Sequence, residues 1–176
     1  MNTAKLVISW RCNMDCSYCC NKSKVLRDAF IPITQSQLKD LPHNDFELTG
    51  GELTLPQEFS TTTELLRNWL PKNRNYYFYT NGVFLTTWHA ELLKRYGVGG
   101  INVGVHLGEK FDWGFKTILR YLDWEQLVEV HKILPIRLWV QDTDVKDFMY
   151  DLPFEIRIWT LGECDNITTD RYYLIK

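Results

Sequence analysis

The stretch KLVISWRCNMDCSYCC, residues 5–20, determines how the rest of the chain is interpreted. Its first six residues, 5–10, predict a short buried strand. Four of the chain's five cysteines then follow within nine positions, 12–20. The cysteines are therefore expected in a loop that begins at the carboxyl end of the first strand.

The spacing of these cysteines indicates a metal centre. Cys12, Cys16 and Cys19 follow the pattern C-x3-C-x2-C. Iron–sulfur clusters and zinc both bind cysteine thiolates, but a closed structural zinc site needs four ligands and normally a second pair downstream. The other cysteines are Cys20 and Cys164, and no two of the four histidines have the spacing of a ligand pair. Three ligands in one loop favour a metal with one open coordination position, with a shared zinc site or a redox pair as the alternative.

Length and composition predict one soluble domain. The chain has 176 residues, of which 45% are hydrophobic and 24% charged, as is usual for globular proteins. A net charge of -2 and a pI near 6.1 provide no general attraction to nucleic acid or to anionic membranes. We find no apolar run long enough to span a membrane and no signal-peptide core, so we expect a cytoplasmic protein. In that reducing compartment, closely spaced cysteines bind metal or do redox chemistry more often than they form disulfides.

Strand and helix signals alternate along the chain. Further strands are predicted at 45–53, 75–82, 100–108, 136–141 and 154–162, and helices at 34–41, 56–70, 84–97 and 114–134, the last with a break near Asp123. The helix over 56–70 has apolar residues on one side, namely Phe59, Leu65, Leu66, Trp69 and Leu70. Alternating β and α units predict an α/β fold with a parallel sheet, in which ligands bind at the carboxyl ends of the strands.

The strand over 100–108 separates two kinds of side chain. Ile101, Val103 and Val105 fall on one face, while Asn102 and His106 fall on the other, because side chains alternate along a strand. One face is therefore apolar and the other small and polar.

Two further motifs follow the cysteines. TGGE, residues 49–52, ends the second predicted strand, and YTNG, residues 79–82, ends the third. With Cys12, Cys16, Tyr18 and Cys19 in the pattern C-x3-C-x-aromatic-C, the chain resembles the radical S-adenosylmethionine (SAM) enzymes. The resemblance covers residues 5–108 by motif and the later units by pattern alone.

The resemblance implies a fold. It implies a partial (β/α)6 TIM-like barrel of parallel strands, formed by a single core domain over residues 1–176. In this domain the cluster loop occupies residues 11–22 and the glycine motif residues 50–52, while residues 165–176 form a tail or an extra strand.

The resemblance also implies cofactors and their ligands. Cys12, Cys16 and Cys19 would hold three irons of an oxygen-sensitive [4Fe-4S] cluster, and the methionine part of SAM would chelate the fourth. A one-electron donor such as a flavodoxin or ferredoxin would supply the electron that cleaves SAM to a 5'-deoxyadenosyl radical, which takes a hydrogen atom from substrate. The residues expected to contact SAM are Tyr18, Gly50, Gly51, Glu52, Thr80, Asn81, Asn102 and His106.

The substrate is expected to be large. No second cysteine cluster follows the first, and few residues remain to cover the mouth of the barrel. We therefore hypothesise that a peptide or protein substrate, or a partner chain, closes the site. The alternatives are a nucleotide-modifying radical SAM enzyme and a noncatalytic iron–sulfur or zinc module. Arg137 and Arg157 are further candidates for binding the SAM carboxylate or the substrate, whereas Cys20 and Cys164 are expected to be packing residues.

Overall fold

The computed structural model describes residues 3–14, 19, 30–105, 122–142, 145–159 and 172–175, without the side chains of residues 159 and 172. In these residues one eight-stranded sheet has the order β2-β8-β1-β3-β4-β5-β6-β7, and all neighbouring strands are parallel. The elements in chain order are β1 (Thr3–Ser9), β2 (Ile31–Ile33), η2 (Gln35–Asp40), β3 (Asp45–Gly50), α2 (Pro56–Asn68), β4 (Asn75–Thr80), α3 (Thr87–Arg95), β5 (Val98–Val105), α5 (Trp124–Ile133), β6 (Ile136–Gln141), η4 (Asp147–Asp151), β7 (Glu155–Trp159) and β8 (Tyr172–Ile175).

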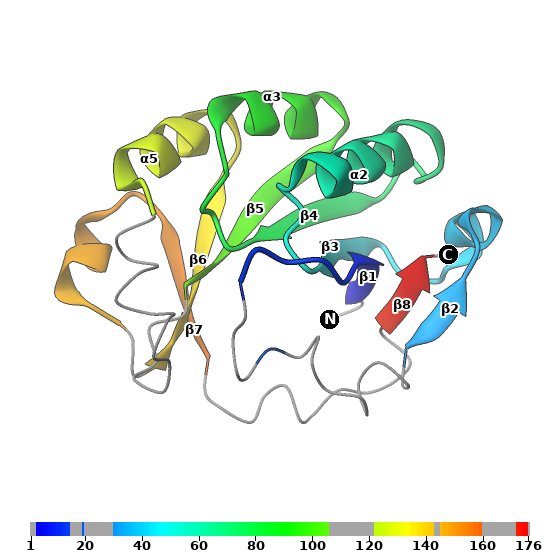
Figure 1. Ribbon diagram of the computed structural model, residues 1–176, viewed down its shortest axis with the longest axis horizontal. Helices are drawn as coiled ribbons and strands as arrows, with labels where there is room; N and C mark the ends of the chain where they lie inside the picture. The colour runs from blue at the N-terminus through cyan, green and yellow to red at the C-terminus, as the bar shows by residue number, and fades with distance from the viewer. Residues whose placement is uncertain are drawn as a thin grey trace.

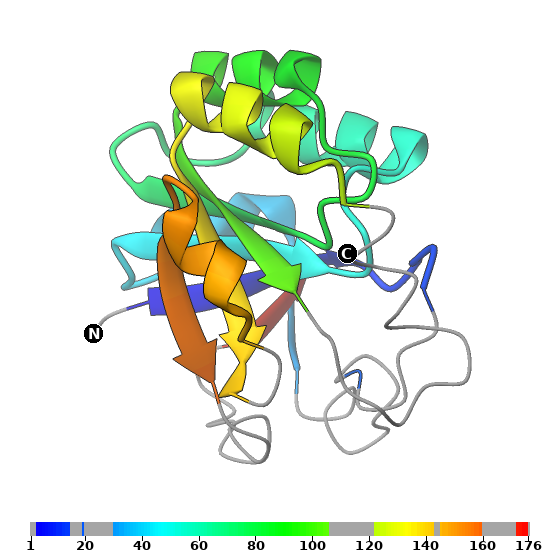
Figure 2. The same ribbon diagram turned by 90° about the vertical axis from the view of Figure 1, so that its left-hand side faces the viewer.

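The sheet is open, and its helices lie on one side. β2 forms one edge of the sheet and β7 the other (Figure 1). Helices α2, α3 and α5 lie side by side over the same face of the sheet (Figure 2). These features confirm the α/β class and the parallel, incompletely closed barrel predicted from the sequence. Among the described residues, none of the helices is both long and apolar enough to cross a membrane.

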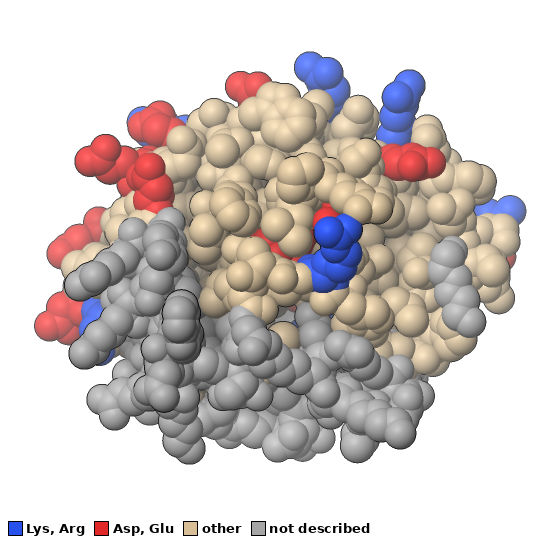
Figure 3. Space-filling model, in the orientation of Figure 1, with Lys and Arg blue, Asp and Glu red and all other residues tan. Residues whose placement is uncertain are grey.

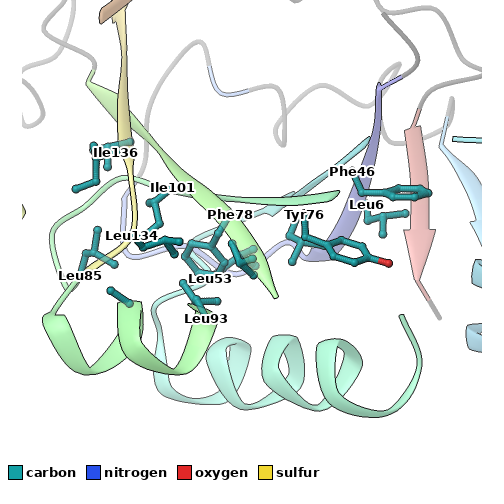
Figure 4. Close-up of a cluster of buried hydrophobic side chains, with 14 of the residues drawn as sticks. Leu6, Phe46, Leu53, Tyr76, Phe78, Leu85, Leu93, Ile101, Leu134 and Ile136 are labelled. Carbon is teal, nitrogen blue, oxygen red and sulfur yellow. The ribbon is translucent and has the colours of Figure 1, made fainter. Parts of the chain in front are cut away.

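The hydrophobic core fills the space between the sheet and the helices. Alternate residues of the strands, such as Leu6, Phe78 and Ile101, are completely buried against helix residues such as Leu93 (Figure 4). Burying a side chain of this size contributes roughly 1.5–3 kcal/mol. Because strand side chains alternate, this core fixes which residues must project from the opposite face.

The sequence prediction contained neither β2 nor η4. β2 was not predicted, because it has only three residues and includes Pro32, and its partner among the described strands is β8. Proline is tolerated at the edge of a sheet, where its missing N–H is not needed. In the helix predicted over 114–134 with a break near Asp123, the described portion is helical from Trp124, which agrees with that break, because the Asp123 side chain caps the helix by accepting a hydrogen bond from the Gln126 N–H at 2.9 Å.

Trp69 was wrongly predicted to lie on the buried apolar side of helix α2. Phe59, Leu65 and Leu66 are buried as expected, but Trp69 is 44% exposed. The α-helix ends at Asn68, and Trp69 is its C-cap with φ -122° and ψ -34°. Because the backbone leaves the helical path at Trp69, its side chain does not continue the apolar stripe.

The face of the sheet turned away from the helices is called the inner face below. Most of its side chains are polar, charged or aromatic, unlike those of the helix-covered face. On the strands from β1 to β7 they include Lys5, Glu47, Tyr77, Tyr79, Asn102, Arg137, Trp139, Glu155 and Arg157.

Candidate functional site

The carboxyl ends of β1 and β3 stay paired beyond the strands. Ser9 is the register partner of Gly50. The Gly51 N–H then donates to the Ser9 carbonyl at 2.6 Å, and the Glu52 N–H donates to the Arg11 carbonyl at 2.7 Å. The end of β1 and the first residue of the cluster loop are therefore held against the TGGE motif, and Cys12 follows at once.

The two motif glycines allow this close approach. A Cβ at Gly50 would lie 2.1 Å from the Ser9 carbonyl oxygen, and one at Gly51 would lie 1.7 Å from that of Arg11. Gly50 also has φ +140°, which side-chain-bearing residues rarely adopt. The sequence predicted close approach to the SAM ammonium group at these glycines, and the approach seen in the structure is to the chain's own backbone.

Glu52 joins the ends of β3 and β4. Its side chain is 1% exposed. Its Oε1 accepts hydrogen bonds from the Thr54 N–H at 2.8 Å and from the hydroxyls of Thr54 and Thr80, both at 2.6 Å. Its Oε2 accepts the Asn81 N–H at 2.7 Å. Glu52, Thr80 and Asn81, predicted separately as site residues, are thus brought together by direct contacts.

Asn81 connects the third motif to the cysteine loop. Its Nδ2 donates to Asn13 Oδ1 at 2.8 Å, and its Oδ1 accepts the Val83 N–H at 3.1 Å. Asn13 directly follows Cys12 and was not singled out in the sequence. The cysteine loop, TGGE and YTNG therefore meet at the carboxyl ends of neighbouring strands, where ligands bind in parallel sheets.

Arg11 attaches the cluster loop to the first turn of α2. Its Nε lies 3.5 Å from Glu58 Oε1, which also accepts the Ser9 hydroxyl at 3.3 Å. The Arg11 guanidinium donates in addition to Gln57 Oε1. Glu58 is buried, and sequence reasoning missed it, although a carboxylate in the first turn of a helix is a recognisable sign of a favourable N-terminal charge.

Two of the predicted metal ligands lie among the described residues. Cys12 is exposed and Cys19 is half-buried, and both are free thiols. Partial desolvation of the thiol raises the pKa of Cys12, and the negative charges of Glu52 and Cys19 act in the same direction. Cys19 is therefore close enough to influence Cys12 electrostatically. A bound cation would reverse this effect by favouring the thiolates, so the two thiols fit an iron–sulfur cluster.

Several predicted residues fall outside the described residues. They are Cys16, Tyr18, Cys20, His106 and Cys164. Within the described ranges, no group of three or more His, Cys, Asp or Glu side chains could hold a metal ion. The predicted cluster site therefore depends on Cys16 as its third ligand.

Asn102 and the two arginines lie on the inner face, apart from this network. Asn102 is 2% exposed, and its Oδ1 has no hydrogen-bond partner among the described residues. Arg137 Nε and Arg157 Nε lie 2.7 and 2.8 Å from the two carboxylate oxygens of Glu155. The two arginines, predicted as candidates for binding the SAM carboxylate or the substrate, are therefore already paired.

The comparison with protein families gives the class of the chain. The model of the Radical SAM superfamily matches residues 6–156. The chain therefore belongs to the radical SAM superfamily, and membership implies SAM cleavage at an iron–sulfur cluster to give a radical. No curated protein matches the chain.

Two solved structures share the fold, and a third was compared with the chain. BtrN in complex with AdoMet and 2-DOIA has 17% identity and a TM-score of 0.50, over 90% of this chain and 69% of that one. Coproporphyrinogen III oxidase (HemN) from Escherichia coli, a radical SAM enzyme, has 13% identity and a TM-score of 0.55, over 90% and 44% of the two chains. Native anSMEcpe with bound AdoMet has 20% identity and a TM-score of 0.48, over 89% and 51%. The chain thus spans about half the length of the last two.

Proposed function

We propose that this chain reductively cleaves SAM at a [4Fe-4S] cluster held by Cys12, Cys16 and Cys19, and abstracts a hydrogen atom from a peptide or protein. The observation that carries the proposal is the junction of the three motifs through Glu52 and Asn81. A metal module without turnover would need the cysteines, but it would not need TGGE and YTNG fastened to the same loop.

The residues of the junction have different tasks in this proposal. The backbone of residues 50–52 and the side chain of Asn81 border the cysteine loop, so they are placed to bind the polar end of SAM. The Glu52 carboxylate accepts four hydrogen bonds from groups of the described chain itself, so Glu52 is a positioning residue. Tyr18 and His106 remain proposed SAM contacts on the resemblance alone.

Charge supports a peptide or protein substrate over a nucleotide. On the described part of the face shown in Figure 3, Lys and Arg side chains stand singly, and Asp and Glu gather at the α5 end. Binding nucleic acid depends on neutralising phosphates with clustered cations. The described surface offers no such cluster on this face, so a substrate without a phosphate backbone, such as a peptide or protein, is the better match.

The test is SAM cleavage by the reconstituted protein. The full chain would be loaded anaerobically with iron and sulfide, reduced with dithionite in the presence of SAM, and assayed for 5'-deoxyadenosine. We expect product from the wild type and from Cys20→Ala, the matched control outside the C-x3-C-x2-C pattern, and none from Cys16→Ala. A wild-type protein that binds zinc, or that carries a full cluster without cleaving SAM, would contradict the proposal and favour the noncatalytic module.

A further inference from the structure

Two buried polar atoms on the inner face lack partners. They are Asn102 Oδ1 on β5 and Trp139 Nε1 on β6, neither of which has a hydrogen-bond partner in the described part of the chain. A buried polar atom left unpaired costs about 1–3 kcal/mol, and most such atoms in folded proteins are paired. A pair of them on neighbouring strands of one face therefore calls for a ligand that satisfies both.

The two atoms belong to one small area of the sheet. In the β5–β6 register Asn102 lies opposite Arg137, and Trp139 lies opposite Gly104, two residues further along the same face. On the other side, Asn102 is the register partner of Tyr79 on β4. The Tyr79 and Trp139 rings are 6.0 Å apart between centroids, although β5 separates their strands. The two rings thus meet over β5, on the face from which Asn102 projects.

The unpaired atoms are complementary in kind. Asn102 Oδ1 is an acceptor, and the indole Nε1–H of Trp139 is a donor. A group that satisfies both must carry one donor and one acceptor. A peptide amide does so, with its N–H and C=O directed to opposite sides, and so does a nucleobase edge. The planes of the two rings are inclined by 47°, which leaves no parallel slot of the kind that stacks a base, and this favours the amide.

The charges around this area favour a neutral ligand. Lys5 Nζ lies 3.6 Å from Glu47 Oε2, and Glu155 holds both Arg137 and Arg157. Each of these inner-face cations has a carboxylate neighbour, so a phosphate or carboxylate would have to compete with it. A neutral amide does not disturb these pairs.

We propose that Asn102 and Trp139 bind a backbone amide of a peptide substrate. Asn102 Oδ1 accepts the amide N–H, Trp139 Nε1–H donates to the amide oxygen, and the Tyr79 ring packs against the group. This inference rests on the proposed function and deepens it, because it names how the substrate is held. Under this proposal Asn102, which was expected to contact SAM, contacts the substrate instead. Its strand, β5, pairs with β4, which ends at Thr80.

The experiment follows the Trp139 indole N–H directly by NMR. The full chain, reconstituted with iron and sulfide but not reduced, would be labelled with 15N in the indole rings of its seven tryptophans. Trp139→Phe identifies the signal. The probe is N-methylacetamide, which carries one amide donor and one acceptor. We expect a saturable shift of the Trp139 signal, with affinity at least about tenfold weaker in Asn102→Leu and unchanged in Asn73→Leu, an exposed matched control.

Two further probes keep the test independent of how the variants fold. N,N-dimethylacetamide retains the acceptor but lacks the N–H, so it should bind the wild type more weakly, and acetate should not shift the signal. Equal shifts with N-methylacetamide and N,N-dimethylacetamide, no saturable shift, or a shift produced by SAM in place of the amide would each overturn the assignment. Because the titration needs no reductant, a chain that binds the amide but forms no 5'-deoxyadenosine contradicts only the proposed function, and the reverse result contradicts only this inference.

Discussion

Two regions of the molecule differ in whether their buried polar groups have hydrogen-bond partners. One is the junction at the ends of β1, β3 and β4, and the other is the inner face of β5 and β6. At the junction, the buried carboxylate of Glu52 accepts four hydrogen bonds from the chain itself. On the inner face, Asn102 Oδ1 and Trp139 Nε1 find no partner among the described residues. The contrast separates a junction whose buried carboxylate is satisfied by the chain itself from an area whose two unpaired atoms are open to the proposed ligand.

The two regions also differ in how their charges are held. Glu52 is almost fully buried, while Glu155, which pairs with two arginines, is 50% exposed in its side chain. Buried charge-assisted hydrogen bonds are strong, and exposed ion pairs contribute little because water and salt screen them. Substitutions at the junction should therefore be far more costly than substitutions among the charges of the inner face.

The largest effect is expected from Gly51→Ala. The added Cβ would lie 1.7 Å from the Arg11 carbonyl oxygen, so the backbone of the cluster loop must move away from TGGE. We expect a loss of about 3 kcal/mol or more in the free energy of unfolding, measured by urea titration, together with a reduced iron content.

Gly99→Ala is the matched control for this prediction. A Cβ at Gly99 would have its nearest neighbour, the Tyr76 carbonyl oxygen, at 3.7 Å, which is an ordinary contact. This variant should keep its stability within about 1 kcal/mol. Equal losses in both variants would show that the junction is not the tightly packed region inferred here.

A smaller effect is expected from Glu52→Gln. The amide keeps one oxygen but places an NH2 group where Oε2 accepts the Asn81 N–H, so two donors face each other. We expect a loss of about 2–3 kcal/mol in the free energy of unfolding. Glu64→Gln, at an exposed position of α2, is the control and should change little. A stability equal to that of the wild type would mean that the carboxylate charge is not needed to join β3 and β4.

The smallest effect is expected from Glu155→Gln. Hydrogen bonding from Arg157, followed by the contacts with Arg137, lowers the pKa of Glu155 below its ordinary value of 4.5. A lowered folded-state pKa contributes stability above the unfolded pKa and loses it as the pH falls through the folded value. The wild type should therefore exceed the variant by at most about 1 kcal/mol at pH 6, and the difference should shrink below pH 4.5 and in high salt.

Urea titrations of both proteins between pH 6 and pH 3.5, at low and high salt, measure this difference. Glu91→Gln on the exposed side of α3 serves as the control. A difference above 2 kcal/mol that persists in high salt would place Glu155 among the tightly held charges and remove the contrast between the two regions.

Much of the fold could be predicted from the sequence because its signals are local. The apolar runs of β1 and β6 and the alternation of β5 are visible in a few residues each, and Pro56 and Gly97 mark the ends of helices. β2 could not be predicted, because a three-residue strand containing proline exists through its pairing with β8, which lies far along the chain. Trp69 was misplaced because the helix ends one residue before it.

The site was predictable in its members but not in its connections. Glu52, Thr80 and Asn81 were expected from two motifs, yet the hydrogen bonds among them depend on the parallel register of β3 and β4. Trp139 was missed, because a tryptophan in a predicted strand is expected to be a core residue. Only the surrounding structure shows that its indole nitrogen is unpaired. Pairing partners and missing partners are properties of three-dimensional contact, which a motif does not encode.

The position of β8 has a consequence for the order of assembly during synthesis. β8 lies between β1 and β2, so residues 172–175 form the link between the strands that flank the cysteine loop (Figure 1). A chain emerging from the ribosome can pair β1 with β3 early, but β2 gains its partner only when β8 has been made. Until then β2 has no partner strand among the described residues, so the edge of the sheet beyond β1 is completed last.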